Sequence, residues 1–134
     1  MFLYVIIDMT TYVDSTYGIT YTKTSDLSLN TATVSAYDGS VPIVVIQDSV
    51  QINGTPHTVI VLDASSSVFQ SNSGLQEITI PSSVTTIYNN TFDGATNLTS
   101  ITLLHTTLPY LEEYALNGVS NTCTLTYISN QYPV

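Results

Sequence analysis

The side chains that could perform catalysis are few in this chain. It has two histidines, His57 and His105, and one cysteine, Cys123, among 134 residues. A catalytic histidine needs a nucleophile and an orienting group within hydrogen-bond reach, and no spacing marks any of the many serines for that role. We therefore predict two partly exposed histidines without a catalytic function, assign no catalytic residue, and expect that the protein is not an enzyme.

The single cysteine excludes an internal disulfide and a zinc site built from several thiolates. Cys123 precedes the β-prone residues 124–128. Because an apolar neighbourhood disfavours the thiolate form, we expect a buried and inert thiol.

Carboxylates in turns are the remaining candidates for a ligand site, here for calcium, which prefers oxygen ligands. They lie in the Asp-Gly turns at residues 38–40 and 93–94 and in the Glu-Glu pair at 112–113. No EF-hand or nonapeptide spacing accompanies them, and turn geometry alone explains an Asp-Gly pair. We predict no metal site and no cofactor.

The charge balance limits the possible partners. Lys23 is the only cationic side chain beside ten carboxylates, which gives a formal net charge of −9 at pH 7. Nucleic-acid affinity depends on Lys and Arg that displace counterions, so a nucleic-acid partner is excluded. No apolar run approaches the length that spans a bilayer, so membrane insertion is not expected either.

A regular spacing of apolar residues organises the elements that would position any site. Phe69 recurs one period later as Phe92. Three further positions recur at the same spacing: Leu75, Ile78 and Ile80 correspond to Leu98, Ile101 and Leu103. A period of about 20 to 30 residues with a short apolar-x-apolar strand in each unit predicts a solenoid of stacked coils.

The repeat continues upstream with an insertion. The interval from Val44 to Ile78 is about half as long again as the period that separates Ile78 from Ile101. The extra residues contain Asn53-Gly54, the strongest short signal for a hairpin turn, followed by a β-branched run. We predict a hairpin near residues 51–62 that grows out of the first coil.

Downstream, the interval from Ile87 to Leu111 slightly exceeds the period, so the last coil holds one extra residue. The inward-facing positions of all coils together form the predicted core: Val44, Ile46, Val50, Phe69, Leu75, Ile78, Ile80, Val84, Ile87, Phe92, Leu98, Ile101, Leu103, Leu111, Leu116 and Leu125.

The string ITIPSSVTTIYNNTFDGATNLTSITL, residues 78–103, resembles the BspA-like leucine-rich repeat family. Residues 101–128 are similar to the closing repeat of such proteins, and residues 17–46 to the β-rich segment that often precedes the first coil. Three positions depart from the family pattern: Thr91 replaces Ala, Tyr88 replaces Gly and Leu116 replaces Phe. These volume changes put packing details in doubt.

The resemblance implies a mainly β fold, a short leucine-rich-repeat solenoid with a β-rich N-terminal cap. We assign residues 1–43 to the cap and residues 44–134 to the coils, within one compact domain. The resemblance also implies a surface protein that binds other proteins or host matrix and has no catalytic residues.

The N-terminal residues 1–8 are apolar for seven positions but lack the basic flank and cleavage site of a signal peptide. We interpret them as a strand. It could pair within the chain or, being β-prone and uncharged, add to a neighbouring subunit.

Two functional classes remain open. One is a non-enzymatic adhesion module exposed on an outer surface, for example an accessory decoration or fibre component of a phage or virus particle. The other is a secreted or cell-surface bacterial adhesin that binds a host protein or glycan. The candidate binding residues are the hairpin pair Asn53 and His57 and three tyrosines, Tyr88, Tyr110 and Tyr114. The expected location is extracellular or on a virion.

Overall fold

The computed structural model describes residues 10–26, 28–62 and 67–128. The strand predicted at residues 1–8 lies outside this part. The described residues form eleven strands and no helix, and therefore no helix long and apolar enough to cross a membrane. The strands are β1 (Thr11–Asp14), β2 (Ile19–Lys23), β3 (Thr31–Tyr37), β4 (Ile43–Val45), β5 (Ser49–Ile52), β6 (Thr55–Leu62), β7 (Glu77–Ile80), β8 (Thr86–Ile87), β9 (Ser100–Leu103), β10 (Tyr110–Leu111) and β11 (Thr124–Tyr127).

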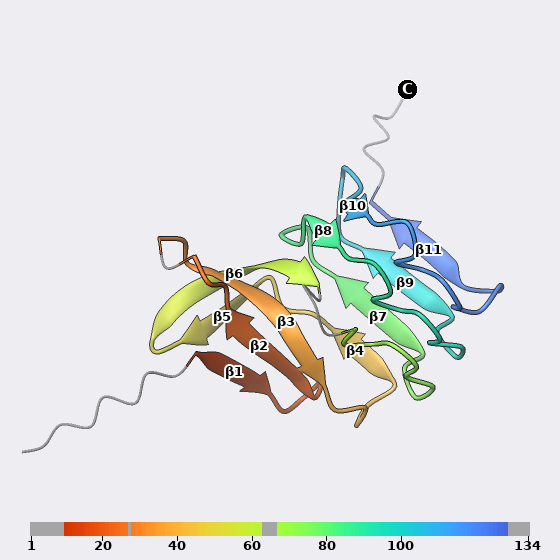
Figure 1. The fold of residues 1–134 in the computed structure, drawn as a ribbon, viewed down its shortest axis with the longest axis horizontal. Helices are drawn as coiled ribbons and strands as arrows, with labels where there is room; N and C mark the ends of the chain where they lie inside the picture. Colours follow the sequence, from red (N-terminus) through yellow and green to blue (C-terminus); the bar gives the residue numbers. More distant parts are fainter. Residues whose placement is uncertain (1–9, 27, 63–66, 129–134) are drawn as a thin grey trace, which may run out of the picture.

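The coils stack as the repeat predicts, which confirms a mainly β solenoid. One parallel sheet has the order β4-β7-β9-β11, with one strand from each coil (Figure 1). Ile78 pairs with Val44 on one side and with Ile101 on the other, and Ile101 pairs with Leu125. These pairings reproduce the spacing in the sequence, including the longer interval at the insertion. The second sheet has the order β1-β2-β3-β6-β8-β10, with β5 paired to β6.

The core is a column of layered apolar side chains. The thirteen predicted core positions from Val44 to Leu103 are at most 3% exposed. Phe69 and Phe92 stack with ring centroids 5.5 Å apart, and Tyr37 of β3 extends this stack at 5.3 Å from Phe69. Burial of these layers removes from water an apolar surface that no single coil could cover alone.

The three predicted core residues nearest the C-terminus are not fully buried. Leu111 and Leu116 are only partly buried, and Leu125 is 40% exposed, so its assignment as a core residue is wrong. The physical reason is that Leu125 lies in the last described coil, where no described strand covers the far side of β11.

Polar side chains bridge the turns of successive coils. The carboxylate of Asp93 accepts one hydrogen bond from Gln70 of the preceding coil at 3.1 Å and one from Asn117 of the next coil at 2.9 Å. The Asp93 carboxylate, a candidate calcium ligand by its sequence, is thus used to join coils. Within the described ranges, no group of three His, Cys, Asp or Glu residues could hold a metal ion.

A left-handed turn repeats at the same place in three coils. Ser71, Gly94 and Gly118 have φ values of 54°, 73° and 72°. The stack is tight, because a Cβ on Gly118 would lie 2.7 Å from the backbone nitrogen of Gly94. Glycine is therefore required at position 118 both by its backbone conformation and by close contact between coils.

The predicted hairpin exists, but it does not simply protrude from the coil. Strands β5 and β6 pair antiparallel around Asn53 and Gly54, whose φ values of 54° and 72° are those of a type I′ turn. However, β6 continues past the hairpin and pairs in parallel with both β3 and β8. The hairpin strand therefore connects the N-terminal cap to the solenoid within one sheet.

A buried polar network fastens the cap to the first coil. The hydroxyl oxygen of Tyr21 accepts a hydrogen bond from the Gln47 backbone N–H at 3.0 Å, and the Gln47 side chain donates to Asp14 at 2.6 Å. Asp14 and Tyr21 are both buried. Desolvation raises the pKa of Tyr21 to about 12, against the lowering effect of the Gln47 hydrogen bond, and the charge of Asp14 adds to the rise.

This pKa shift predicts alkaline sensitivity. The folded-state pKa of about 12 exceeds the ordinary value of 10.0, so the unfolded chain loses the Tyr21 proton first. The stabilisation is fully present below pH 10 and is lost between pH 10 and 12, by about 2 to 3 kcal/mol. Urea unfolding should therefore show a steeper loss of stability in this window for the natural protein than for Tyr21→Phe.

The Tyr21→Phe variant is expected to start about 1 kcal/mol less stable at neutral pH, because the Gln47 N–H loses its acceptor. Because the natural protein then loses about 2 to 3 kcal/mol between pH 10 and 12, the two stability curves should approach each other above pH 10 and cross within this window. Parallel curves throughout this range would show that Tyr21 does not cause the alkaline sensitivity.

Candidate functional site

The last described coil exposes the end of the apolar column. Along the register Val44, Ile78, Ile101 and Leu125, the exposed fraction is 0, 1, 2 and 40%. Tyr127, which pairs with the buried Leu103, is 51% exposed. These side chains have the alternation of core residues but remain accessible, since β11 pairs only with β9 among the described strands.

We name this surface the terminal face. Strands β10 and β11 lie at the same end of the solenoid (Figure 1). The apolar side chains exposed there, by 40 to 67%, are Leu108, Tyr110, Tyr114, Leu125, Tyr127 and Ile128. The predicted binding residues Tyr110 and Tyr114 thus lie at the same end of the solenoid as Leu125 and Tyr127, which the sequence did not assign to binding.

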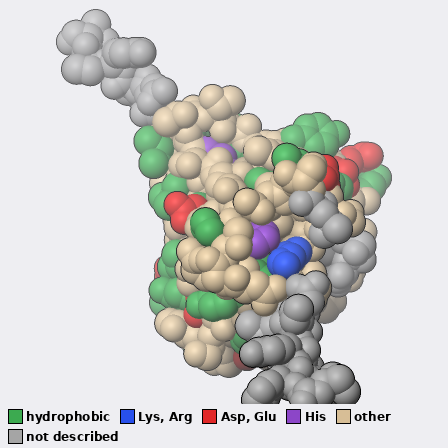
Figure 2. Space-filling view, turned by 90° about the vertical axis from the view of Figure 1, so that its left-hand side faces the viewer, with side chains coloured by type: hydrophobic (Ala, Val, Ile, Leu, Met, Phe, Trp, Pro, Cys, Tyr) green, Lys and Arg blue, Asp and Glu red, His purple; other side chains and the backbone are tan. Residues whose placement is uncertain are grey.

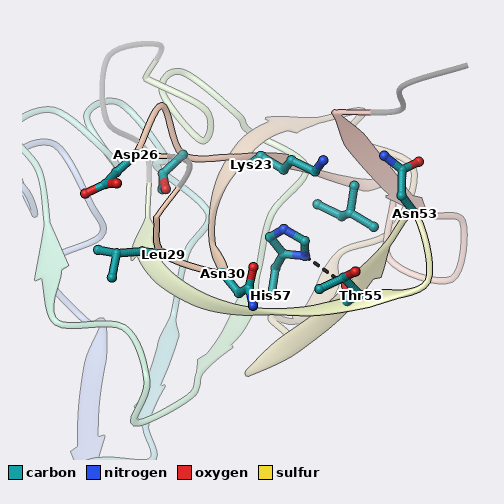
Figure 3. A pocket seen from close by; sticks show the side chains of 9 residues that line it. Lys23, Asp26, Leu29, Asn30, Asn53, Thr55 and His57 are labelled. Carbon is teal, nitrogen blue, oxygen red and sulfur yellow. Dashed lines mark hydrogen bonds between the residues drawn. The ribbon is translucent and has the colours of Figure 1, made fainter. Parts of the chain in front are cut away.

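A pocket of about 140 Å³ lies at the opposite end of the molecule, between the loop after β2 and the β5–β6 hairpin. Figure 2 faces this end and shows the lysine at the surface beside a histidine ring. The pocket is lined by Lys23, Thr24, Asp26, Leu29, Asn30, Ile52, Asn53, Thr55 and His57 (Figure 3).

Local hydrogen bonds fix the loop that forms one wall of this pocket. The Thr24 backbone N–H donates to the Thr31 carbonyl at 3.0 Å, and the Asn30 carbonyl accepts from the Thr58 N–H of β6 at 2.9 Å. Hydrogen bonds from the hydroxyl and backbone N–H of Ser28 lower the pKa of Asp26. The Asp26 carboxylate is therefore charged at neutral pH and points away from Lys23 (Figure 3).

His57 forms the inner part of the pocket. Its Nδ1 lies 2.8 Å from the Thr55 carbonyl oxygen, and because a carbonyl only accepts, Nδ1 is the donor in this hydrogen bond. Nε2 is directed away from Thr55, into the space toward Lys23 (Figure 3). The expectation of partial exposure was wrong, since His57 is 5% exposed. It lies on β6, which pairs with both β5 and β3.

The other predicted chemical residues are separated from this pocket and have structural contacts. His105 is buried, contrary to expectation, and its Nε2 lies 2.7 Å from the Val84 carbonyl oxygen. Cys123 is only partly buried, and this burial raises the pKa of its thiol. The backbone carbonyl of Tyr88 accepts a hydrogen bond from the Thr91 hydroxyl at 2.8 Å, so this buried hydroxyl has a partner.

Two of the pocket residues, Asn53 and His57, were predicted from the sequence, whereas the loop opposite them was missed. One available signal was Lys23, because a single cation in a strongly acidic chain is a distinctive feature. Its proximity to the hairpin follows from the pairing of β3 with β6, which are separated in the chain and joined only in the folded sheet.

Solved structures with the same fold are bacterial leucine-rich repeat proteins. A leucine rich cell surface protein from Faecalibacterium prausnitzii has a TM-score of 0.58 and 23% identity, over 88% of this chain and 30% of that chain. A leucine-rich repeat protein from Bacteroides capillosus has a TM-score of 0.64 and 18% identity, over 90% of this chain and 99% of that chain.

A third structure, a leucine-rich repeat protein from Bacteroides ovatus, has a TM-score of 0.55 and 19% identity, over 82% of this chain and 36% of that chain. The chain therefore spans about a third of the length of the Faecalibacterium prausnitzii and Bacteroides ovatus structures. At these identities the likeness establishes the fold. No curated protein matches the chain.

The sequence also matches a family model directly. The BspA type leucine rich repeat region, in six copies, matches residues 59–132, which is more than half of the chain. The match covers the stacked coils β7 to β11 and agrees with the resemblance drawn from residues 78–103. The chain belongs to the BspA type leucine-rich repeat family.

Proposed function

We propose that this chain is a non-enzymatic recognition module that binds a partner protein through its terminal face. One observation carries the proposal: Leu125 and Tyr127 continue the core column in register, yet they are 40% and 51% exposed. Exposed apolar side chains that gather at one end of a domain are typical of a binding site.

The partner's chemistry follows from the geometry of the edge. An extended segment can add to a free strand edge through backbone hydrogen bonds, while its alternate side chains enter apolar positions. Two apolar residues at positions i and i+2 of the partner segment would cover Leu125 and Tyr127. Glu113 is exposed in the same coil, and the net charge of the chain is −9. Basic residues beside the apolar pair of the partner segment should therefore favour association.

The absence of catalysis is part of this proposal. Both histidines have a ring nitrogen within hydrogen-bond distance of a backbone carbonyl, and they lie in different parts of the molecule. An outer cell surface is the proposed location, because one structure of the same fold is that of a leucine rich cell surface protein. A phage or virus component, the other expectation from the sequence, draws no support from these relatives.

A random peptide display library is a suitable probe, because it samples many partner sequences at once. Selection on the immobilised protein should enrich peptides with two apolar residues at positions i and i+2 and with Lys or Arg nearby. The double variant Leu125→Asp/Tyr127→Asp should bind those peptides at least tenfold more weakly, because it places charge where apolar side chains must pack.

The matched control is Val13→Asp/Ile43→Asp. It adds the same two charges at side chains that are 62% and 51% exposed, the second on β4 at the other edge of the same sheet. This variant should retain binding. Enrichment of peptides without the apolar pair, or equal binding by both double variants, would refute recognition through the terminal face.

A further inference from the structure

The pocket beside the β5–β6 hairpin differs in chemistry from the terminal face. It brings Lys23, the only cation of the chain, next to His57, whose side chain is 5% exposed. With a net charge of −9, the protein repels anions over most of its surface. An anionic group is therefore best accommodated beside Lys23, where a charge-assisted hydrogen bond can form.

The remaining lining groups suit a ligand that carries hydroxyls as well as charge. Asn30, Asn53 and Thr55 offer amide and hydroxyl groups, which both donate and accept. His57 adds its Nε2, since its Nδ1 already donates to the Thr55 carbonyl.

The volume limits the ligand's size. Pockets for drug-sized molecules have volumes of about 300 to 1,000 Å³, whereas this one measures about 140 Å³. The space therefore suits one small ring and not a peptide or an oligosaccharide chain, although a chain could present its terminal ring.

We propose that this pocket binds one hexuronic acid ring, with the carboxylate at Lys23 and the ring hydroxyls at Asn30, Asn53 and His57. The charged Asp26 at the rim is hydrogen-bonded by Ser28 and points away from Lys23. The site lies at the other end of the molecule from the terminal face, so each can operate without the other.

The test is a titration of the ¹⁵N-labelled protein with D-glucuronate, followed by ¹H–¹⁵N correlation spectra. Pocket resonances should shift with a Kd on the order of millimolar, as expected for a ligand of about a dozen non-hydrogen atoms. Glucose differs from glucuronate in lacking the carboxylate, and acetate lacks the ring. Each should bind at least about tenfold more weakly, since each loses one set of contacts.

Variants identify the source of the effect. Lys23→Gln should weaken glucuronate binding about tenfold or more, while Lys23→Arg should retain most of it. Asn121→Asp is the matched control, because it changes the net charge by the same amount as Lys23→Gln at an exposed site in the last coil, and it should bind normally. Correctly folded spectra of each variant confirm that lost binding is not unfolding.

Four results would overturn the proposal: no shifts of pocket resonances with glucuronate, equal affinity for glucose, equal affinity for acetate, or unchanged glucuronate binding by Lys23→Gln. None of these measurements depends on the terminal face or on a peptide partner.

Discussion

Replacing Phe92 by alanine is expected to lower the free energy of unfolding by about 3 to 5 kcal/mol. Phe92 is fully buried in the middle coil, and its ring stacks on that of Phe69 at 5.5 Å. Its backbone N–H donates to the Ala115 carbonyl of the next coil at 3.1 Å, which holds the coil in place and limits collapse around a cavity. Urea or thermal unfolding, monitored by far-UV circular dichroism, measures the change.

Two controls separate the cavity from a general effect of substitution. Phe92→Leu keeps much of the volume and should cost less than about 1.5 kcal/mol if the site can repack. Tyr114→Ala removes an aromatic ring that is 49% exposed and should change stability by about 0.5 kcal/mol or less. A Phe92→Ala variant as stable as the natural protein would contradict the layered core.

Replacing Gly118 by alanine is expected to destabilise the protein by about 2 to 4 kcal/mol, the sum of a backbone and a steric cost. The backbone at position 118 has φ of 72°, which costs an L-residue with a Cβ about 1 to 2 kcal/mol. In addition, the new Cβ would lie 2.7 Å from the Gly94 nitrogen. Because the clash is with backbone, one coil must shift against the next, at about 1 to 3 kcal/mol for an overpacked site.

Gly54→Ala isolates the steric part of this effect. Gly54 has the same φ of 72°, but a Cβ there would meet nothing within 4 Å. Gly54→Ala should lower the free energy of unfolding only by the backbone cost of a positive φ, about 1 to 2 kcal/mol. Chemical denaturation of the two variants in parallel gives the difference, and equal losses of stability would show that the coils at position 118 are not in tight contact.

The coil architecture was predictable because each coil has a strand whose apolar residues must be buried against the strand of a neighbouring coil. Ile78 and Ile101 lie one period apart, and a strand with alternate apolar residues can bury them only against an equivalent strand. The pairing partners therefore follow from the spacing itself. The Asn53-Gly54 turn was equally readable, because few dipeptides adopt two successive positive φ values.

The sites were less predictable because they form between segments that do not repeat. Lys23 and His57 meet only because β3 pairs in parallel with β6, and no periodic signal in the chain encodes that pairing. The buried network of Tyr21 and Asp14 with Gln47 has the same origin. The cap and the solenoid have different sequence patterns, and no common spacing relates their residues. Contacts between them can therefore be identified only from the pairing of strands in the folded sheet.

By itself, the sequence determined which residues form rungs and how far apart they lie along the chain. Periodicity encodes this information, because every stacked coil must present its apolar side chains to the same column. Tertiary structure alone decided where the column remains exposed. Leu125 has the pattern of a core residue and is nevertheless 40% exposed, because burial depends on a neighbouring strand in space and not on the residue's own position in the repeat.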